Sequence, residues 1–223
     1  MSADATAHHL TVRRTARYYT LGNPDTATEH WFVLHGYGQL AEYFVRPFAA
    51  IAGRDRVVIA PEALSRFYVD GMREHERVGA SWMTKADRAC EIRDYVAYLD
   101  ALAGRIGPAA AEPAPKTCVL GFSQGAATAS RWALLGDTAV DRLVLWGGSL
   151  AHDLDLDAHR ARLARLDLTL VVGTGDEYIS EARVAEEEAR LDAHGIPYRT
   201  VRFEGGHRID PNVLHRVARE GVA

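Results

Sequence analysis

A single serine stands between two glycines in the stretch V-L-G-F-S-Q-G, where Gly121 and Gly125 flank Ser123 at a distance of two positions. An apolar run precedes the serine and a helical pattern follows it, so Ser123 falls at a strand-to-helix turn. A G-x-S-x-G turn of this kind exposes a nucleophilic hydroxyl at the carboxyl end of a strand, and its glycines let the two backbones approach closely. The start of the helix also favours developing negative charge. An alternative role for Ser123 is that of a simple helix N-cap.

Two downstream residues supply the base and the acid that a serine nucleophile needs. Asp176 in LTLVVGTGDEY and His207 in YRTVRFEGGHRID each follow an apolar run typical of a strand. Their order along the chain is the one expected after this kind of turn, so we assign Ser123, Asp176 and His207 as a catalytic triad. Asp153, which follows an earlier strand, is the second choice for the acid. Other downstream histidines lie in helical patterns or at a helix end and fit less well: His159, His194 and His215.

Backbone amides are expected to bind the oxyanion that forms during acyl transfer. One donor is the N–H of Gln124, the residue after the nucleophile, and the other comes from the loop after an early strand. The glycine-rich loop at residues 35–38 follows the apolar run WFVL. We assign the second donor to the amide of Tyr37, with Gly38 as the alternative.

Two rival interpretations use neighbouring residues. Residues 36–41 match the G-x-G-x-x-A fingerprint of a dinucleotide-binding turn, and Glu62 follows the next strand, where a ribose-binding acid would lie. This short pattern leaves Ser123 and its partners unexplained, so we prefer the hydrolytic interpretation. A calcium loop is also disfavoured, because the positions that need glycine and glutamate are both alanine; its acids would be Asp153, Asp155 and Asp157.

The elements around these residues alternate between strands and helices. Short apolar runs predict strands at residues 16–20, 31–34, 57–59, 117–120, 142–146, 169–172 and 198–203. Helical patterns lie at residues 39–52, 86–104, 124–135, 157–165, 180–193 and 210–220. Most of the apolar runs are continuous, as in strands covered on both faces. The alternation predicts an α/β fold, with a mostly parallel central sheet and helices on both faces, in a single compact domain over residues 1–223.

Residues 61–87 break this alternation because they show no sustained period. A segment of that length is often a lid or a binding loop, so we expect it to cover the active site. The expected substrate-binding residues come from this segment and from two other loops: Phe67, Tyr68, Trp82, Met83, Leu150 and Tyr178. An alternative role for Trp82 and Phe67 is to anchor the segment to the core. We expect residues 1–9 and the alanine- and proline-rich residues 107–115 to be flexible.

Composition limits the classes of function. The 223 residues carry a net charge of −4, with 48% hydrophobic and 25% charged residues, as in a globular protein with a sizeable core. The negative charge argues against general nucleic-acid binding, and no apolar stretch is long enough for stable membrane insertion. The N-terminal residues contain no apolar signal-peptide segment, and Cys90 and Cys118 indicate reduced thiols. We therefore expect a cytoplasmic protein.

The motifs LHGYGQ, GFSQG, GTGDEY and EGGH occur in this order along the chain. With them the chain resembles the α/β-hydrolase superfamily, most closely its compact carboxylesterase, phospholipase and acyl-protein thioesterase branch. The resemblance runs from the strand at residue 31 to the last helix. It implies a serine hydrolase without cofactor or metal that cleaves a small-molecule carboxylic ester or thioester through an acyl-enzyme.

Two departures from the motifs of that branch fall near the expected substrate. The usual L-H-G-L-G-D is L-H-G-Y-G-Q here, with Tyr37 and Gln39, and a W-F-D-type segment is W-M-T at residues 82–84. The resemblance therefore does not carry over a substrate preference; we favour small or medium acyl substrates over bilayer lipids. Two other classes of function stay open: a hydrolase-fold protein that binds a ligand without turnover, and the same triad used for peptide cleavage or acyl transfer to an alcohol.

Overall fold

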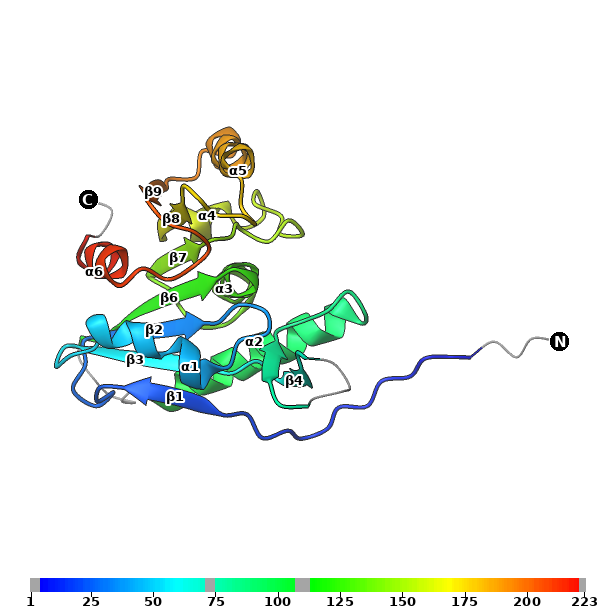
Figure 1. Ribbon diagram of the computed structural model, residues 1–223. Helices are drawn as coiled ribbons and strands as arrows, with labels where there is room; N and C mark the ends of the chain where they lie inside the picture. The colour runs from blue at the N-terminus through cyan, green and yellow to red at the C-terminus, as the bar shows by residue number, and fades with distance from the viewer. Residues whose placement is uncertain (1–4, 71–74, 107–112, 221–223) are drawn as a thin grey trace.

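A central sheet organises the chain, in a computed structural model that describes residues 5–70, 75–106 and 113–220. The strand order is β1-β3-β2-β6-β7-β8-β9, and the sheet is drawn in Figure 1. Among the described strands, β1 runs antiparallel to β3 and the other neighbours in this sheet are parallel. The strands are β1 Tyr18–Leu21, β2 Glu29–Leu34, β3 Arg56–Pro61, β6 Lys116–Phe122, β7 Arg142–Trp146, β8 Asp167–Gly173 and β9 Arg199–Phe203.

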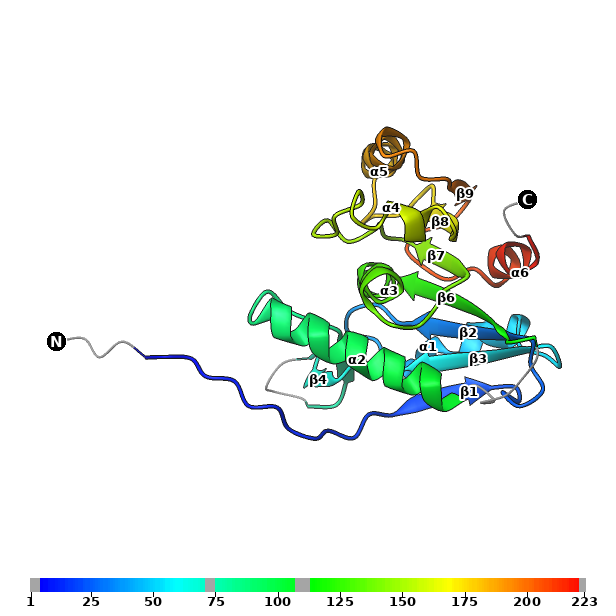
Figure 2. The same cartoon turned by 180° about the vertical axis from the view of Figure 1, so that it is seen from behind.

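Helices cover both faces of this sheet. In Figure 1 the short helices α1 and η1 and the last helix α6 lie in front of the sheet, and Figure 2 shows α2 and α3 on the opposite face. Residues of α4 and α5 pack into the same core as α2 and α3. The helices are α1 Ala41–Phe44, the 3-10 helix η1 Arg46–Ala50, α2 Arg88–Ile106, α3 Gln124–Leu135, α4 Arg160–Leu163, α5 Glu181–Ala193 and α6 Pro211–Arg219.

Successive side chains of β2 pack alternately against the helices on the two faces of the sheet. Trp31 and Val33 pack in the core that includes α1, η1 and α6, whereas Phe32 and Leu34 pack in the core that includes α2 and α3. All four side chains are at most 1% exposed. Because side chains alternate along a strand, a strand covered on both faces is apolar at every position. This confirms the α/β fold that the continuous apolar runs predict.

The predicted and observed elements differ mainly at their ends. α3 and β7 begin and end at the predicted residues. The helix expected at residues 39–52 is instead divided into α1 and η1. Pro47 lies in the first turn of η1, and it has no amide hydrogen with which to continue the α-helical bonds. The helix expected at residues 157–165 is reduced to α4.

Residues 61–87 contain regular structure that the sequence does not reveal. β4 Ser65–Tyr68 and β5 Val78–Ser81 pair as an antiparallel hairpin. The Gly38 amide donates to the Ala80 carbonyl at 2.9 Å, and the Ala80 amide donates to the Gln39 carbonyl at 3.1 Å. The hairpin is therefore joined to the glycine-rich loop. Strands of four residues are too short to show a period, which explains the missed prediction.

Several expectations concern the ends and connections of the chain. Residues 1–4 and 107–112 of the two segments expected to be flexible lie outside the described residues. Residues 5–17 contain neither helix nor strand, and His9 Nε2 lies 2.9 Å from Asp87 Oδ2. Cys90 and Cys118 are free thiols. None of the described helices is long and apolar enough to cross a membrane.

Candidate active site

The turn between β6 and α3 has the geometry that its glycine spacing predicts. Ser123 has φ 54° and ψ −118°, a conformation that is costly for any residue with a side chain. A β-carbon on Gly121 would lie 2.1 Å from the Gly125 carbonyl oxygen, and one on Gly125 would lie 2.2 Å from the Leu34 carbonyl oxygen. Backbone atoms occupy the space of a side chain at both positions, so both require glycine.

The Ser123 side chain does not cap the helix that follows it. Its hydroxyl forms no capping hydrogen bond at the start of α3. By contrast, Ser180 accepts a bond from a first-turn amide of α5, and Asp210 does so in α6. Ser123 therefore occupies the N-cap position of α3, but its side chain does not act as a cap. Ser123 instead lines a cavity of about 240 Å³, which we call the serine cavity.

His207 and Asp176 meet beyond the carboxyl ends of β9 and β8. Their side chains are 13% and 1% exposed, and His207 Nδ1 lies 2.7 Å from Asp176 Oδ2. A carboxylate can only accept, so Nδ1 carries the proton and Nε2 is the basic nitrogen. The other carboxylate oxygen accepts from the amides of Tyr178 and Ile179 at 2.9 and 3.0 Å. These two bonds fix the carboxylate in the orientation that holds the imidazole.

Three neighbours confine the imidazole ring. The rings of Phe122 and Tyr178 have centroids 4.7 and 4.8 Å from that of His207. Gly147, with φ 58°, is the third: a β-carbon on it would lie 2.9 Å from His207 Cε1. Sequence analysis missed the role of Gly147. Its signal is the glycine pair directly after the strand in LVLWGGS.

Ser123 and His207 both line the serine cavity. No hydrogen bond joins their side chains in the described part of the chain, and the bonded ring nitrogen of His207 is Nδ1. Bonds between a nucleophile and its base are often long in ligand-free enzymes and shorten when substrate binds. His207 Nε2 is therefore free to take a proton from a group in this cavity.

The glycine-rich loop lies directly against the serine. A β-carbon on Gly36 would stand 3.2 Å from Ser123 Cβ. The Gly38 amide already donates to the hairpin, which removes it as an oxyanion donor. The Tyr37 amide donates to none of the described residues, and Gln124, as the first residue of α3, has no intrahelical acceptor. The amides of Tyr37 and Gln124 are thus both available beside the serine.

The Gln124 side chain joins the turn to the segment after the hairpin. Its Oε1 accepts from the Trp82 amide at 3.1 Å, and its Nε2 donates to the Met83 carbonyl at 2.9 Å. Nε2 also lies 3.1 Å from Ser81 Oγ. These contacts join residues about forty positions apart in the chain. The local sequence around Gln124 does not predict them.

Two predicted substrate-binding residues, the buried Leu150 and the exposed Tyr178, line the serine cavity, and Trp82 does not. Trp82 is 3% exposed, and its indole N–H donates to the His35 carbonyl at 2.8 Å. Trp82 therefore anchors its segment to the core, which corrects its assignment as a substrate-binding residue.

The remaining predicted residues of this group lie in or beside the hairpin. The Phe67 ring packs on the Tyr37 ring with centroids 5.2 Å apart, and the exposed Tyr68 ring lies 4.7 Å from that of His75. The Met83 sulfur lies 3.5 Å from an Arg131 nitrogen. The described lining of the serine cavity includes none of Phe67, Tyr68 and Met83.

A second and larger cavity also reaches His207. It measures about 710 Å³ and is lined by Phe122, the glycine-rich loop, α1 and the hairpin. The hairpin contributes Val69, Glu76, Arg77 and Val78 to this lining, and none of the predicted aromatic residues. We call it the hairpin cavity. The candidate reaction centre thus opens to two cavities built from different elements.

Asp153, the second choice for the triad acid, contacts arginines instead of His207. Arg131 Nη2 donates to Asp153 Oδ1 at 2.7 Å, and Arg88 Nη2 lies 3.1 Å from the same oxygen. Burial alone would raise the pKa of Asp153, but the hydrogen bonds from Arg131 hold it below its ordinary value. Asp153 is therefore an ionised partner of two arginines. The calcium interpretation fails because Asp153 contacts arginines. Asp155 in turn accepts a hydrogen bond from a backbone amide of its own turn.

Glu62 does not provide a carboxylate for a ribose. Its side chain is 1% exposed and accepts from Arg17 Nε at 2.8 Å and Arg66 Nη1 at 3.1 Å. The helix that follows the glycine-rich loop, α1, has four residues. The dinucleotide interpretation of residues 36–41 therefore lacks both its acid and its helix.

His35 links the glycine-rich loop to the end of β3. Its Nε2 accepts from the Ala63 amide at 3.1 Å, so Nδ1 is the protonated nitrogen and donates to the Gly36 carbonyl at 2.8 Å. Burial lowers the pKa of His35 to about 4. The ring is therefore neutral, and both of its nitrogens are used in holding the loop.

The chain is similar over nearly its full length to solved structures of proteins named as thioesterases, esterases or carboxylesterases. With Zea mays acyl-protein thioesterase 2 the TM-score is 0.71 at 19% identity, covering 92% of this chain and 97% of that one. With esterase PE8 the TM-score is 0.67 at 21% identity, covering 92% of this chain and 99% of that one. With the Bacillus cereus carboxylesterase the TM-score is 0.64 at 14% identity, covering 92% of each chain. No protein-family model and no curated protein matches the sequence. The chain therefore has the α/β-hydrolase fold of these esterases and thioesterases.

Proposed function

We propose that the chain is a serine hydrolase that cleaves carboxylic esters or thioesters through a covalent acyl-enzyme. The observation that carries this proposal is the 2.7 Å contact between His207 Nδ1 and Asp176 Oδ2, beside a cavity that Ser123 also lines. Ser123 adds the backbone strain that is common at reactive positions. Proteins of similar structure that are named as esterases, carboxylesterases and thioesterases support the same class of reaction.

Acylation begins when His207 Nε2 takes the proton of the Ser123 hydroxyl as its oxygen attacks the carbonyl carbon. The amides of Tyr37 and Gln124 donate hydrogen bonds to the resulting oxyanion. Asp176 keeps the proton on Nδ1 and stabilises the imidazolium. Collapse of the intermediate breaks the bond to the leaving oxygen or sulfur, and Nε2 returns its proton to that leaving group. The product of this half is acyl-Ser123 and a free alcohol or thiol.

Deacylation repeats these steps with water as the nucleophile. His207 Nε2 takes a proton from the water, and the hydroxide oxygen bonds to the acyl carbon. Collapse then breaks the bond to the serine oxygen, which recovers its proton from His207 while the carboxylic acid leaves.

Because the serine cavity and the hairpin cavity both reach His207, we assign them to the two halves of the substrate. Volumes of about 240 and 710 Å³ favour small or medium substrates.

A panel of p-nitrophenyl esters from acetyl to palmitoyl tests this proposal, with wild type beside Ser123→Ala. We expect wild-type turnover with an optimum chain length, and a loss of at least about 10⁴-fold in kcat in the variant. Circular dichroism and Tm control for folding. Equal turnover by the two proteins would contradict the proposal. Folded wild type that turns over no ester would favour the ligand-binding alternative, or a triad dedicated to peptides or acyl transfer.

A further inference from the structure

Two arginines border the cavity that Ser123 lines. Arg88, the first residue of α2, and Arg131 of α3 are both lining residues. They share one counter-charge, because Arg131 Nη2 lies 2.7 Å and Arg88 Nη2 lies 3.1 Å from Asp153 Oδ1. Two guanidinium groups and one carboxylate leave a single uncompensated positive charge at the edge of the serine cavity.

The two arginines differ in how many of their N–H groups are already used. The Arg131 side chain is 5% exposed; besides its bonds to Asp153, it donates to the Tyr95 hydroxyl at 3.3 Å and to the Met83 sulfur at 3.5 Å. The Arg88 side chain is 41% exposed, and Asp153 is its one ion-pair partner among the described residues. A guanidinium has five N–H donors, so Arg88 retains donors for a group bound in the cavity.

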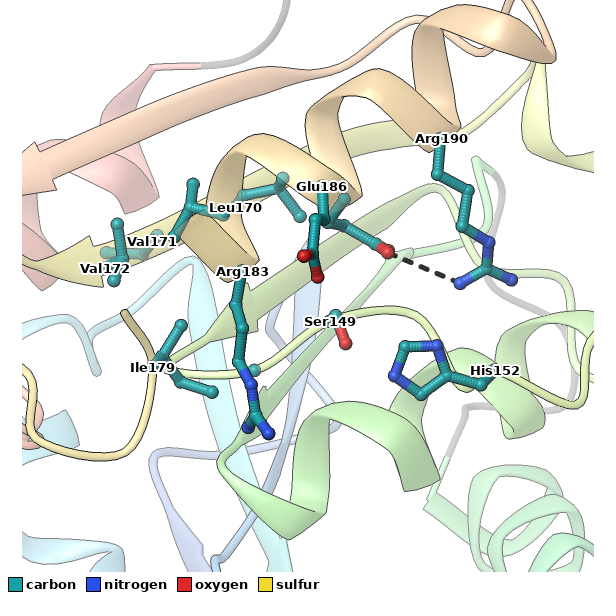
Figure 3. A pocket seen from close by; sticks show the side chains of 12 residues that line it. Ser149, His152, Leu170, Val171, Val172, Ile179, Arg183, Glu186 and Arg190 are labelled. Carbon is teal, nitrogen blue, oxygen red and sulfur yellow. Dashed lines mark hydrogen bonds and ion pairs between the residues drawn. The ribbon is translucent and has the colours of Figure 1, made fainter. Parts of the chain in front are cut away.

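An adjoining cavity of about 460 Å³ extends the serine cavity beneath α5. The two share Gly148, Ser149, His152 and Ile179. Figure 3 shows Arg183 and Arg190 reaching from α5 into the adjoining cavity, with Ser149 and His152 across from the helix.

The adjoining cavity, however, has balanced charge. Its two lining arginines are matched by Glu186 and Glu187, and Arg190 Nη1 lies 3.3 Å from Glu187 Oε2. The uncompensated charge on this side of the site therefore belongs to the pair that shares Asp153, and Arg88 is the member that can reach a ligand.

We propose that Arg88 is an anion-binding residue of the substrate site, and that the preferred substrates are esters with a carboxylate on the part that occupies the serine cavity. This inference rests on the proposed hydrolase function. A carboxylate supplies the single negative charge that the two arginines and Asp153 leave unmatched, whereas a phosphate monoester carries nearly two. Arginine binds carboxylates through parallel N–H donors, and such charge-assisted bonds are about twice as strong as neutral ones. Asp153 holds the guanidinium in place before the substrate arrives.

Matched esters test this proposal. p-Nitrophenyl valerate and p-nitrophenyl hemiglutarate have acyl chains of equal length that end in a methyl group or a carboxylate. Phenyl butyrate and 4-carboxyphenyl butyrate place the same difference on the leaving group. We expect wild type to prefer the charged member in one of these two pairs, as judged by kcat/KM after subtraction of the uncatalysed rate. The pair that shows the preference identifies which half of the substrate occupies the serine cavity.

The variant Arg88→Gln is expected to lower that charged-to-neutral ratio about tenfold. Arg88→Lys should restore part of the preference, because it keeps the charge and loses the fork of donors. Arg105→Gln, in the last turn of the same helix, is the matched control and should leave both rates unchanged. No preference in either pair, or an equal fall for both members in Arg88→Gln, would overturn the proposal.

A binding measurement separates this proposal from the hydrolase function. Calorimetric titration of Ser123→Ala with monomethyl glutarate needs no turnover, and we expect binding that is weakened about tenfold by Arg88→Gln. Such binding without turnover of any ester would support the anion site and contradict the proposed function. Turnover that depends on Ser123, with no binding that depends on Arg88, would leave the function standing and overturn the anion site.

Discussion

Two histidines follow strands at the carboxyl edge of the sheet, and their surroundings give them different properties. His35, after β2, is fully buried, and its nitrogens are bonded to the backbone of Ala63 and Gly36. His207, after β9, uses Nδ1 to contact Asp176 and keeps Nε2 free at the edge of a cavity. A histidine can act as a base only if one nitrogen is free to take a proton. The partner of the second nitrogen therefore separates a structural histidine from a catalytic candidate.

The same contrast applies to two aspartates after neighbouring strands. Asp176, after β8, accepts from two backbone amides and from His207. Asp153, after β7, accepts hydrogen bonds from Arg131 and forms an ion pair with Arg88. One carboxylate orients an imidazole ring, and the other contacts two arginines beside the serine cavity. Residue type and position after a strand are alike in these cases, and the contacts decide the role.

Replacement of the free histidine has the largest expected effect. His207→Gln removes the base, so we expect kcat for a p-nitrophenyl ester to fall by on the order of 10⁵-fold with little change in Tm. His35→Gln should show the reverse pattern, with measurable turnover and a free energy of unfolding lower by about 2 kcal/mol, because two buried backbone groups lose good partners. Ester kinetics and urea unfolding check both variants. Turnover by His207→Gln within tenfold of wild type would break the comparison.

Replacement of the two aspartates comes next. Asp176→Asn cannot hold the proton on Nδ1, and we expect a loss in kcat of about 10⁴-fold. Asp153→Asn is the matched control and should reduce kcat for a neutral ester far less. It should lower Tm, because it leaves Arg131 with a 5% exposed side chain and no nearby carboxylate. Similar kinetic losses in the two variants would mean that Asp176 has no special role.

The pH dependence of stability tests the role of His35 independently of enzyme activity. Burial lowers the pKa of His35 from 6.5 to about 4, so between these values the unfolded chain binds a proton that the folded chain does not. The free energy of unfolding should therefore decrease as the pH falls through this range, by about 3 kcal/mol from this residue. Urea unfolding at several pH values should show a smaller decrease in His35→Gln. Identical pH dependence in both proteins would contradict the assignment.

A smaller effect is expected where the backbone touches the His207 ring. A β-carbon in Gly147→Ala would lie 2.9 Å from His207 Cε1, and we expect the displaced ring to lower kcat about 10²-fold. Gly195→Ala is the matched control, because φ is also positive there, at 61°, and the nearest side-chain atom is 3.9 Å away. Both variants should lose about 1 kcal/mol of stability from backbone strain. Equal kinetics in the two variants would argue that Gly147 does not position the ring.

The sequence predicts most of the sheet and the three residues proposed as the triad. Ser123, Asp176 and His207 each follow a continuous apolar run, and the carboxyl ends of parallel strands share one edge of the sheet. The spacing of Gly121 and Gly125 likewise predicts the strain and close packing at the serine turn.

Contacts between distant segments could not be predicted in this way. The burial of Trp82, the bridge from Gln124 to Met83 and the pairing of Asp153 with Arg88 depend on how loops from different strands meet. An aromatic residue in an aperiodic segment serves equally well as a core anchor or as a pocket wall. The sequence pattern is the same in both cases, which is why it could not separate the core anchor Trp82 from a substrate-binding residue.

Covalent labelling with a fluorophosphonate, followed by intact-mass and peptide analysis, tests the central claim most directly. The reagent reacts with a serine only when a neighbouring base and oxyanion donors activate its hydroxyl. We expect one adduct per chain, on the peptide that contains Ser123, with no adduct in Ser123→Ala and far slower labelling in His207→Gln. Folded wild type that stays unlabelled, or an adduct that persists in Ser123→Ala, would contradict the assignment of Ser123 as an activated nucleophile.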